Sequence, residues 1–191
     1  FQAAAQSLGI KTDERKQYKA HTVSNTFEGT LASKSGCHEV TDTITVYEPQ
    51  KDDTQFYVTY DDTQEKSRSL FVEKCLKDKD QYTVFFGGNH PKITIRTTSE
   101  SGRRLLIFKD SYANSFIQFL TPYYEKIILV DPRYYYDNAS SIITGEEITD
   151  VLFLYNLNTY LEDNSLADTL DAAQPEQTEG GDTAATNTDQ A

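Results

Sequence analysis

The sequence has few of the residues that bind metals or build disulfide frameworks. It contains two cysteines and three histidines in 191 residues. Neither Cys37 nor Cys75 stands in a CxxC spacing, and their pairing cannot be read from sequence, so we expect both to be free or structurally incidental. His21, His38 and His90 lie in unrelated segments without the paired spacing of a zinc or iron site. We therefore predict no metal and no cofactor.

Basic residues and long apolar runs are also scarce. Eighteen Lys and Arg face 30 Asp and Glu, which gives a net charge of -12. This balance argues against a protein that binds the phosphate backbone of nucleic acids. The longest apolar candidate, residues 127–131, has only the length of a strand. We expect membrane anchoring, if any, only through a segment that is not present here.

Methionine is absent, and the chain opens in an alanine-rich segment, residues 1–9. This segment has the pattern of the second half of an amphipathic helix, and Gly9 suits the cap at its end. We expect the chain to be the C-terminal portion of a longer polypeptide, whose export signal, if it has one, would precede Phe1.

Aromatic residues are plentiful at 12%, with 13 Tyr and 10 Phe, so the chain can bury a large apolar area. The last 25 residues differ, because residues 167–191 contain no aromatic and no basic side chain but six acidic ones. Such a segment cannot offset the entropy that ordering would cost. We predict one partial α/β domain over residues 1–166 and a disordered acidic tail over residues 167–191, whose simplest role is solubility or spacing.

The first half of the chain predicts strands with one polar face. Residues 42–48 and 55–61 alternate polar and apolar positions, and the turn-like residues 49–53 separate them. We predict that they form a β-hairpin inserted at about residues 40–62, with one face exposed to solvent.

Two more strands are predicted further on, at residues 81–86 and 92–97. The connection between them, residues 87–91, is short, glycine-rich and polar.

The second half changes pattern. Apolar runs at residues 103–108, 127–130 and 151–155 alternate with helical stretches at residues 112–120 and 140–147. Buried strands that alternate with helices indicate parallel βαβ units and a three-layer α/β fold. Functional groups then gather at the carboxyl ends of the strands. The residues at these ends are Asp110, Ser111, Asp131, Arg133, Tyr155, Asn156 and Asn158.

The clearest local signal is a strand followed by Lys109, Asp110 and Ser111 and then by a helix. A serine at this junction presents its hydroxyl beside the unpaired N–H groups of the helix N-terminus, which is a reasonable place for a nucleophile. The alternative is that Asp110 or Ser111 only caps the helix, as these residue types commonly do.

Four strings of the sequence resemble the C-terminal half of the bacterial DHHW family, which is similar to SGNH hydrolases and to the alginate O-acetyltransferase proteins of the SGNH type. They are LLIFKDSYANSF at 105–116, GGNHP at 87–91, VDPRYY at 130–135 and DVLFLYN at 150–156. The likeness runs from about residue 1 to about residue 163. It implies a three-layer, SGNH-hydrolase-like (flavodoxin-like) parallel sheet.

The resemblance also implies a function. Ser111 matches the family's serine, and the Asp and His that activate it would precede Phe1. The parent protein would then be a secreted or cell-surface esterase or O-acetyltransferase that acts on cell-envelope carbohydrate. Two features depart from the pattern: Lys109 replaces the usual glycine, and no histidine follows His90. The alternative is a non-catalytic carbohydrate-binding or surface-assembly module on the same scaffold.

Further residues have a functional and a structural interpretation. Gly88 and Asn89 complete an oxyanion hole or form a tight turn. Arg133 holds an anionic or polyhydroxyl ligand or pairs with Asp131. Tyr155 donates a hydrogen bond to the substrate or is a core phenol.

Two other features stay open in the same way. His90 is a substitute base or a structural residue, and residues 134–136 form a sugar-stacking surface or a loop anchor.

Overall fold

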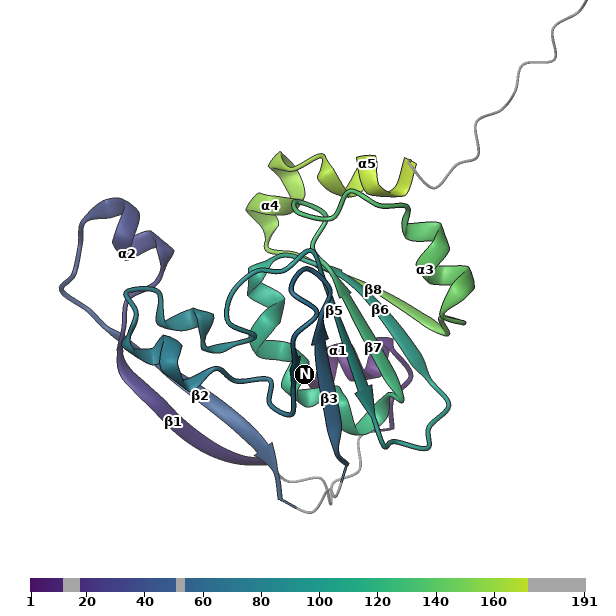
Figure 1. Cartoon of the computed structure of the whole chain (residues 1–191). Helices are drawn as coiled ribbons and strands as arrows, with labels where there is room; N and C mark the ends of the chain where they lie inside the picture. Colours follow the sequence, from purple (N-terminus) through teal and green to yellow (C-terminus); the bar gives the residue numbers. More distant parts are fainter. Residues whose placement is uncertain (12–17, 51–53, 172–191) are drawn as a thin grey trace, which may run out of the picture.

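The computed structural model describes residues 1–11, 18–50 and 54–171, which form a six-stranded sheet, a separate two-stranded ribbon and several short helices (Figure 1). The strands are β1 (Tyr18–Phe27), β2 (Asp42–Pro49), β3 (Phe56–Tyr60), β4 (Lys66–Ser67), β5 (Lys92–Thr97), β6 (Arg104–Lys109), β7 (Lys126–Val130) and β8 (Asp150–Leu154). The α-helices are α1 (Gln2–Ser7), α2 (Thr30–Ser35), α3 (Ala139–Gly145), α4 (Leu157–Glu162) and α5 (Ser165–Asp171). The 3-10 helices are η1 (Glu73–Lys77), η2 (Gln81–Val84), η3 (Ser111–Phe119) and η4 (Thr121–Tyr123).

The large sheet is mixed, with the strand order β4-β3-β5-β7-β6-β8. β6 pairs in parallel with both β7 and β8, so the three predicted parallel strands are confirmed, although β8 is only partly buried. β3 and β5 run antiparallel to their neighbours, so the expectation of a wholly parallel sheet is wrong. The reason lies in the chain length between β5 and β6, because residues 98–103 are too few for the crossover that parallel strands need.

Both faces of the sheet are covered. Leu105 and Ile107 of β6 pack in one core with Ile117 of η3. Leu106 and Phe108 pack in a second core with Ala139 and Ile142 of α3. Because side chains alternate along a strand, residues 105–109 of this interior strand are buried on one side or the other. The chain therefore leaves β6 toward one face of the sheet and β7 toward the other.

The predicted hairpin within residues 40–62 does not form. β2 pairs with β1 in an antiparallel ribbon, whereas β3 joins the large sheet between β4 and β5. Alternation of polar and apolar residues marks a strand but does not identify its partner. Part of the expected turn, residues 51–53, lies outside the described residues.

The strand expected at residues 81–86 is also wrong. Residues 81–84 form η2, and the side chain of Asp80 caps it by accepting a hydrogen bond from the Tyr82 amide. Phe85 makes only an isolated bridge to Phe71. The start of the helix depends on the capping residue, which the apolar pattern does not include.

The chain ends agree only in part with expectation. α1 forms as predicted and is followed by Gly9 with a φ of 63°. The first residues of the expected tail belong instead to α5, where Leu166 and Leu170 pack against the second core. Residues 172–191 lie outside the described residues. None of the helices in the described ranges combines the length and the apolar character that a bilayer crossing needs.

Candidate functional site

Three parallel strands end at one edge of the sheet, and polar residues follow each of them. Because β6 pairs in parallel with β7 and β8, the structure brings Ser111, Asp131 and Tyr155 to this edge. The chain turns toward opposite faces after β6 and β7. Crevices at such switch points are where open α/β sheets bind ligands. We call this edge the strand-end site.

Asp110 is the buried centre of the strand-end site. Its side chain is 0% exposed and caps η3 by accepting a hydrogen bond from the Tyr112 amide at 2.9 Å. Its other carboxylate oxygen accepts hydrogen bonds from the backbone and side-chain amides of Asn156. Asp110 therefore makes the helix cap, and it also ties the end of β6 to the end of β8.

Ser111 is the first residue of η3 and is partly exposed. Because Asp110 makes the cap, the Ser111 hydroxyl is not needed for it. Within the described part of the chain, this hydroxyl has no hydrogen-bond partner. It lies at the sheet edge beside an N-terminus whose N–H groups attract negative charge.

Lys109 is an unexpected feature of the site, because it is 0% exposed. The parallel register that places Phe108 beside Val130 puts Lys109 next to Asp131. The Lys109 ammonium lies 3.8 Å from the Asp131 carboxylate and has no hydrogen-bond partner among the described residues. Burial lowers the pKa of Lys109 from 10.5 to about 8, against the opposing attraction of Asp131.

Arg133 forms the ion pair that was its structural alternative. Its Nε and Nη2 donate to the two carboxylate oxygens of Asp131 at 2.8 and 2.6 Å. Asp131 is 0% exposed, and these hydrogen bonds raise the pKa of the Arg133 guanidinium. The planar fork is thus engaged with Asp131, as the structural alternative predicts.

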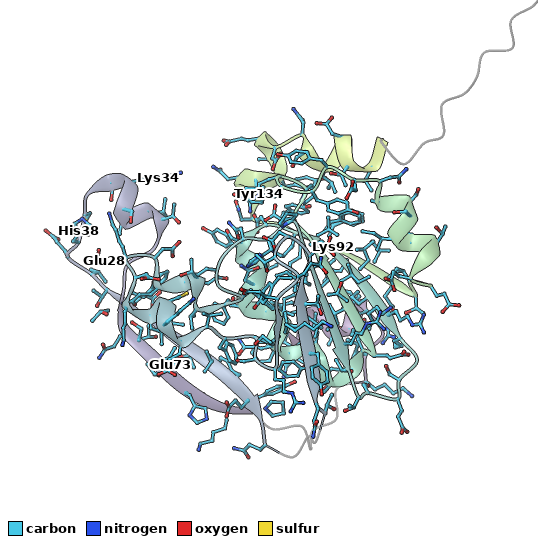
Figure 2. The ribbon with its side chains drawn as sticks, viewed as in Figure 1. Glu28, Lys34, His38, Glu73, Lys92 and Tyr134 are labelled. Carbon is cyan, nitrogen blue, oxygen red and sulfur yellow. The ribbon has the colours of Figure 1, made fainter. Side chains whose placement is uncertain are left out.

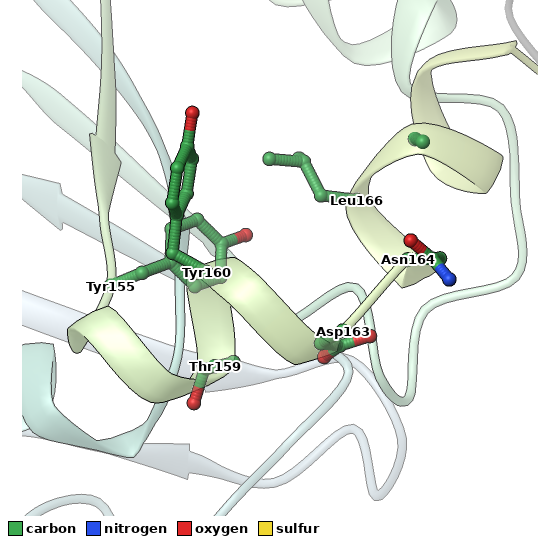
Figure 3. Close-up of a pocket in the computed structure, with 7 residues that line it drawn as sticks. Tyr155, Thr159, Tyr160, Asp163, Asn164 and Leu166 are labelled. Atoms are coloured by element: carbon green, nitrogen blue, oxygen red, sulfur yellow. The ribbon is translucent and has the colours of Figure 1, made fainter.

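Tyr155 lies where β8 leads into α4, and it borders a pocket. The cavity measures about 240 Å³ and is lined by Thr159 and Tyr160 of α4 and by Leu166 of α5 (Figure 3). The Tyr155 hydroxyl is buried without a hydrogen-bond partner among the described residues. Burial and then the negative charge of Asp131 raise the pKa of Tyr155, so the phenol stays protonated as a donor.

The glycine-rich loop of residues 87–91 reaches the same edge of the sheet, since the Asp131 amide donates to the carbonyl of Pro91 at 3.0 Å. The amide of Gly87 donates to the Thr83 carbonyl at 2.9 Å, and the amide of Gly88 donates to the Phe85 carbonyl at 3.3 Å. Both glycines have positive φ, 80° and 122°. The tight-turn interpretation therefore holds for Gly88, whose amide is not free for an oxyanion.

Asn89, the next residue of the loop, is exposed. Its side-chain amide makes no hydrogen bond within the described ranges, so of the two predicted oxyanion donors only Asn89 keeps a free donor.

The ring nitrogens of the three histidines contact other residues than Ser111. The His90 ring nitrogens contact Asp62 at 2.9 Å and the Phe86 carbonyl at 3.1 Å. His38 pairs with Glu28 beside α2, far from Tyr134 and the strand ends (Figure 2). The His21 ring pairs with Glu48 on the ribbon. The role of His90 as a substitute base is therefore not supported.

The tyrosines after β7 divide by exposure. Tyr135 is buried at 5%, whereas Tyr134 and Tyr136 are 43% and 88% exposed. The ring of Tyr134 also carries the Arg133 guanidinium at 5.3 Å from its centroid. Tyr135 anchors the loop, and its two neighbours present aromatic surface beside the strand-end site.

The sequence did not predict two structural contacts in this region. One is the link from Asp110 to Asn156, which needs the pairing of β6 with β8 to be known. The other is Tyr82, whose hydroxyl donates to the Tyr112 carbonyl and accepts from the Ser115 amide, both at 3.2 Å. The predicted strand at residues 81–86 concealed this contact with η3. Tyr82 therefore fixes the helix that begins at Ser111.

The two cysteines do not form a disulfide with each other. Cys37 is an exposed free thiol and Cys75 is a buried one. In residues 1–11, 18–50 and 54–171, no three His, Cys, Asp or Glu side chains are placed to hold a metal ion.

The fold and the strand-end site define an α/β protein with a partly exposed serine at the switch point of a mixed sheet. The chain is similar to the crystal structure of a DHHW family protein from Eubacterium siraeum, with 28% identity, a TM-score of 0.75 and 88% of this chain covered. It spans 58% of that protein's chain.

Two weaker matches share the fold. A structure of Bacillus cereus PatB1 with a sulfonyl adduct has 18% identity, a TM-score of 0.61 and coverage of 79% of this chain and 50% of its own. A second PatB1 structure has 16% identity, a TM-score of 0.58 and coverage of 83% and 56%. No family model matches the sequence, and no curated protein matches it.

Proposed function

We propose that this chain is the C-terminal portion of a secreted or cell-surface SGNH-like esterase or O-acetyltransferase that acts on cell-envelope carbohydrate. Ser111 takes the acyl group in this scheme. The observation that carries the proposal is the position of its hydroxyl, which is partly exposed, has no hydrogen-bond partner among the described residues and stands at the switch point of the sheet. The similarity to a DHHW family protein supports it. The fold would then be the three-layer SGNH-hydrolase-like arrangement.

The neighbours of Ser111 take limited roles in this chemistry. The N-terminal amides of η3 and the side chain of Asn89 stabilise the developing oxyanion. Tyr155 donates a hydrogen bond to the acyl oxygen from the wall of its pocket. Arg133 fixes Asp131 rather than the substrate.

A general base is the missing part. A serine hydroxyl needs one to become a nucleophile, and the three histidines are paired with Glu48, Glu28 and Asp62. We propose that a longer parent polypeptide supplies an Asp-His pair, as the DHHW resemblance implies. The 191-residue chain is then inactive by itself.

Serine labelling tests the proposal. A fluorophosphonate probe is applied to a longer polypeptide of the same gene, and mass spectrometry locates the adduct, with p-nitrophenyl acetate turnover measured in parallel. We expect label on Ser111, and loss of both label and turnover in Ser111→Ala. Ser115→Ala is the matched control, because Ser115 lies on the same helix and is also partly exposed. Equal labelling and turnover in wild type and Ser111→Ala would reject the nucleophile.

Lys109 favours the second candidate, a non-catalytic carbohydrate-binding or surface-assembly module. Its buried side chain occupies the position where SGNH-type motifs have glycine. In that case glycan binding survives Ser111→Ala and weakens in Tyr155→Phe, which removes only the hydroxyl of a residue that lines the pocket.

A further inference from the structure

A second cavity lies away from the strand-end site, between the ribbon and the body of the protein. The ribbon of β1 and β2 stands apart from the large sheet in Figure 1. Between it and the helices η2 and η3 is a cleft of about 370 Å³. Ser115, Gln118 and Phe119 of η3 form one wall, and Thr43, Thr45 and Tyr47 of β2 form the other. We call this cavity the ribbon cleft.

Side-chain contacts hold the two walls of the ribbon cleft in place. The amide of Tyr47 donates to the side-chain carbonyl of Gln118 at 2.6 Å, and Gln118 is only 4% exposed. The rings of Tyr47 and Phe119 lie 5.2 Å apart. At the other end, the ring of Phe27 lies 6.2 Å from that of Tyr82. The cleft is therefore a formed site with an aromatic pair at each end.

The polar groups in the cleft are uncharged. The hydroxyls of Thr43, Thr45 and Tyr47 have no hydrogen-bond partner in the part of the chain that the structure describes. None of the described lining residues is acidic or basic, and a protein of net charge -12 repels anions. An ionic ligand would lose its hydration without gaining a counter-charge. Aromatic faces with free hydroxyls suit a neutral ligand that has apolar faces and many hydroxyls.

An extended peptide fits the cleft less well. In an antiparallel ribbon alternate amides of β2 point outward, and the contact of Tyr47 with Gln118 shows that the odd-numbered ones face the cleft. The amide of Thr43 donates to the Asp42 side chain at 2.7 Å. Only the amide of Thr45 is then left for a partner, whereas strand addition needs a row of such groups.

We propose that the ribbon cleft binds a neutral oligosaccharide, with sugar rings on its aromatic walls and sugar hydroxyls on Thr43, Thr45 and Tyr47. The choice of carbohydrate as the ligand class rests on the proposed function. The site itself is separate from Ser111. Since η3 begins at Ser111 and forms a wall of the cleft, a glycan bound here runs beside the helix that carries the serine.

Calorimetric titration of the 191-residue chain tests the proposal. The neutral probes are chitotetraose and cellotetraose, and the anionic probe is tetragalacturonate. We expect saturable binding of at least one neutral probe, and at least a tenfold loss in Thr45→Arg, which places a long cation in the cleft. Thr22→Arg is the matched control, because Thr22 lies opposite Thr45 in the ribbon, is exposed and does not line the cleft. Circular dichroism confirms that the variants fold.

The outcomes separate this site from the catalytic proposal. Binding that persists in Ser111→Ala, and that falls several-fold in Tyr47→Phe, supports the ribbon cleft whatever the labelling of Ser111 shows. Absence of binding by both neutral probes, equal loss in Thr22→Arg and Thr45→Arg, or tighter binding of the anionic probe would overturn it.

Discussion

At the scale of single residues, the strand-end site concentrates buried charge beside Ser111. Buried ions are costly unless hydrogen bonds satisfy them. Asp131 has the Arg133 fork, and Asp110 has the amides of Tyr112 and Asn156. Lys109 has a carboxylate 3.8 Å away but no hydrogen-bond partner in the described ranges. Its charge is therefore the least compensated of the group.

Lys109→Met is expected to stabilise the protein near neutral pH. The folded-state pKa of Lys109, about 8, lies below its ordinary 10.5. Between these values the unfolded chain binds more protons than the folded one, so wild-type stability rises with pH in this window and the penalty is complete below pH 8. Methionine removes a cost of roughly 3 kcal/mol at neutral pH. Urea unfolding from pH 7 to pH 10.5 gives the difference between the two proteins, which should shrink as the pH rises, and parallel profiles would contradict this.

Arg133→Ala is expected to destabilise the protein, because it leaves the fully buried Asp131 carboxylate without its two hydrogen bonds. We expect a loss of about 3 kcal/mol, at the lower end for a broken buried pair since Arg133 is partly exposed. Arg68→Ala is the control, since Arg68 stacks on Tyr57 at the surface and should cost less than about 0.5 kcal/mol. Thermal unfolding measures both. Equal losses would mean that the ion pair is not buried in solution.

At the scale of helices and strands, the sequence predicts what an element is better than what it pairs with. β6, β7 and β8 were predictable because each is a short apolar run, and β6 and β7 are covered on both faces of the sheet. The pairing of β2 with β1 was not predictable, because residues 28–41, which include α2, separate the two strands in place of a short turn. Ser111 could be placed at a strand end from sequence alone. The sequence did not predict which residue caps the helix or where the Gly88 amide is used. The structure shows that Asp110 makes the cap and that the Gly88 amide belongs to a turn.

Gln118→Ala is expected to loosen the ribbon without unfolding the sheet. Gln118 is the η3 side chain that bonds the outward amide of Tyr47, and it also donates to the Ser115 carbonyl. Hydrogen exchange should accelerate roughly 5- to 30-fold for β2 amides, because the loss of a buried hydrogen bond costs about 1 to 2 kcal/mol. Exchange in β6 and β7 should not change. Acceleration of all strands alike would show that the ribbon and the sheet open as one unit.

At the scale of the whole molecule, the outermost strand of the sheet is incompletely covered. β8 pairs only with β6 within the described residues, and Val151 and Phe153 are 41% and 50% exposed. Phe153 stacks on Phe108, so it extends the second core to the surface. The solved DHHW family structure is longer than this chain, which spans 58% of it. An open strand with apolar side chains is a surface that other strands can join.

We therefore expect the 191-residue chain to self-associate through β8 as its concentration rises. Phe153→Lys should keep the chain monomeric, because a charge on an open strand opposes edge-to-edge pairing. Tyr57→Lys is the matched control, since Tyr57 is 44% exposed but lies on β3, which has a strand on each side. Sedimentation velocity over a range of concentrations distinguishes the three proteins. A wild-type chain that stays monomeric throughout, or a Tyr57→Lys variant that loses association equally, would show that β8 is not the associating surface.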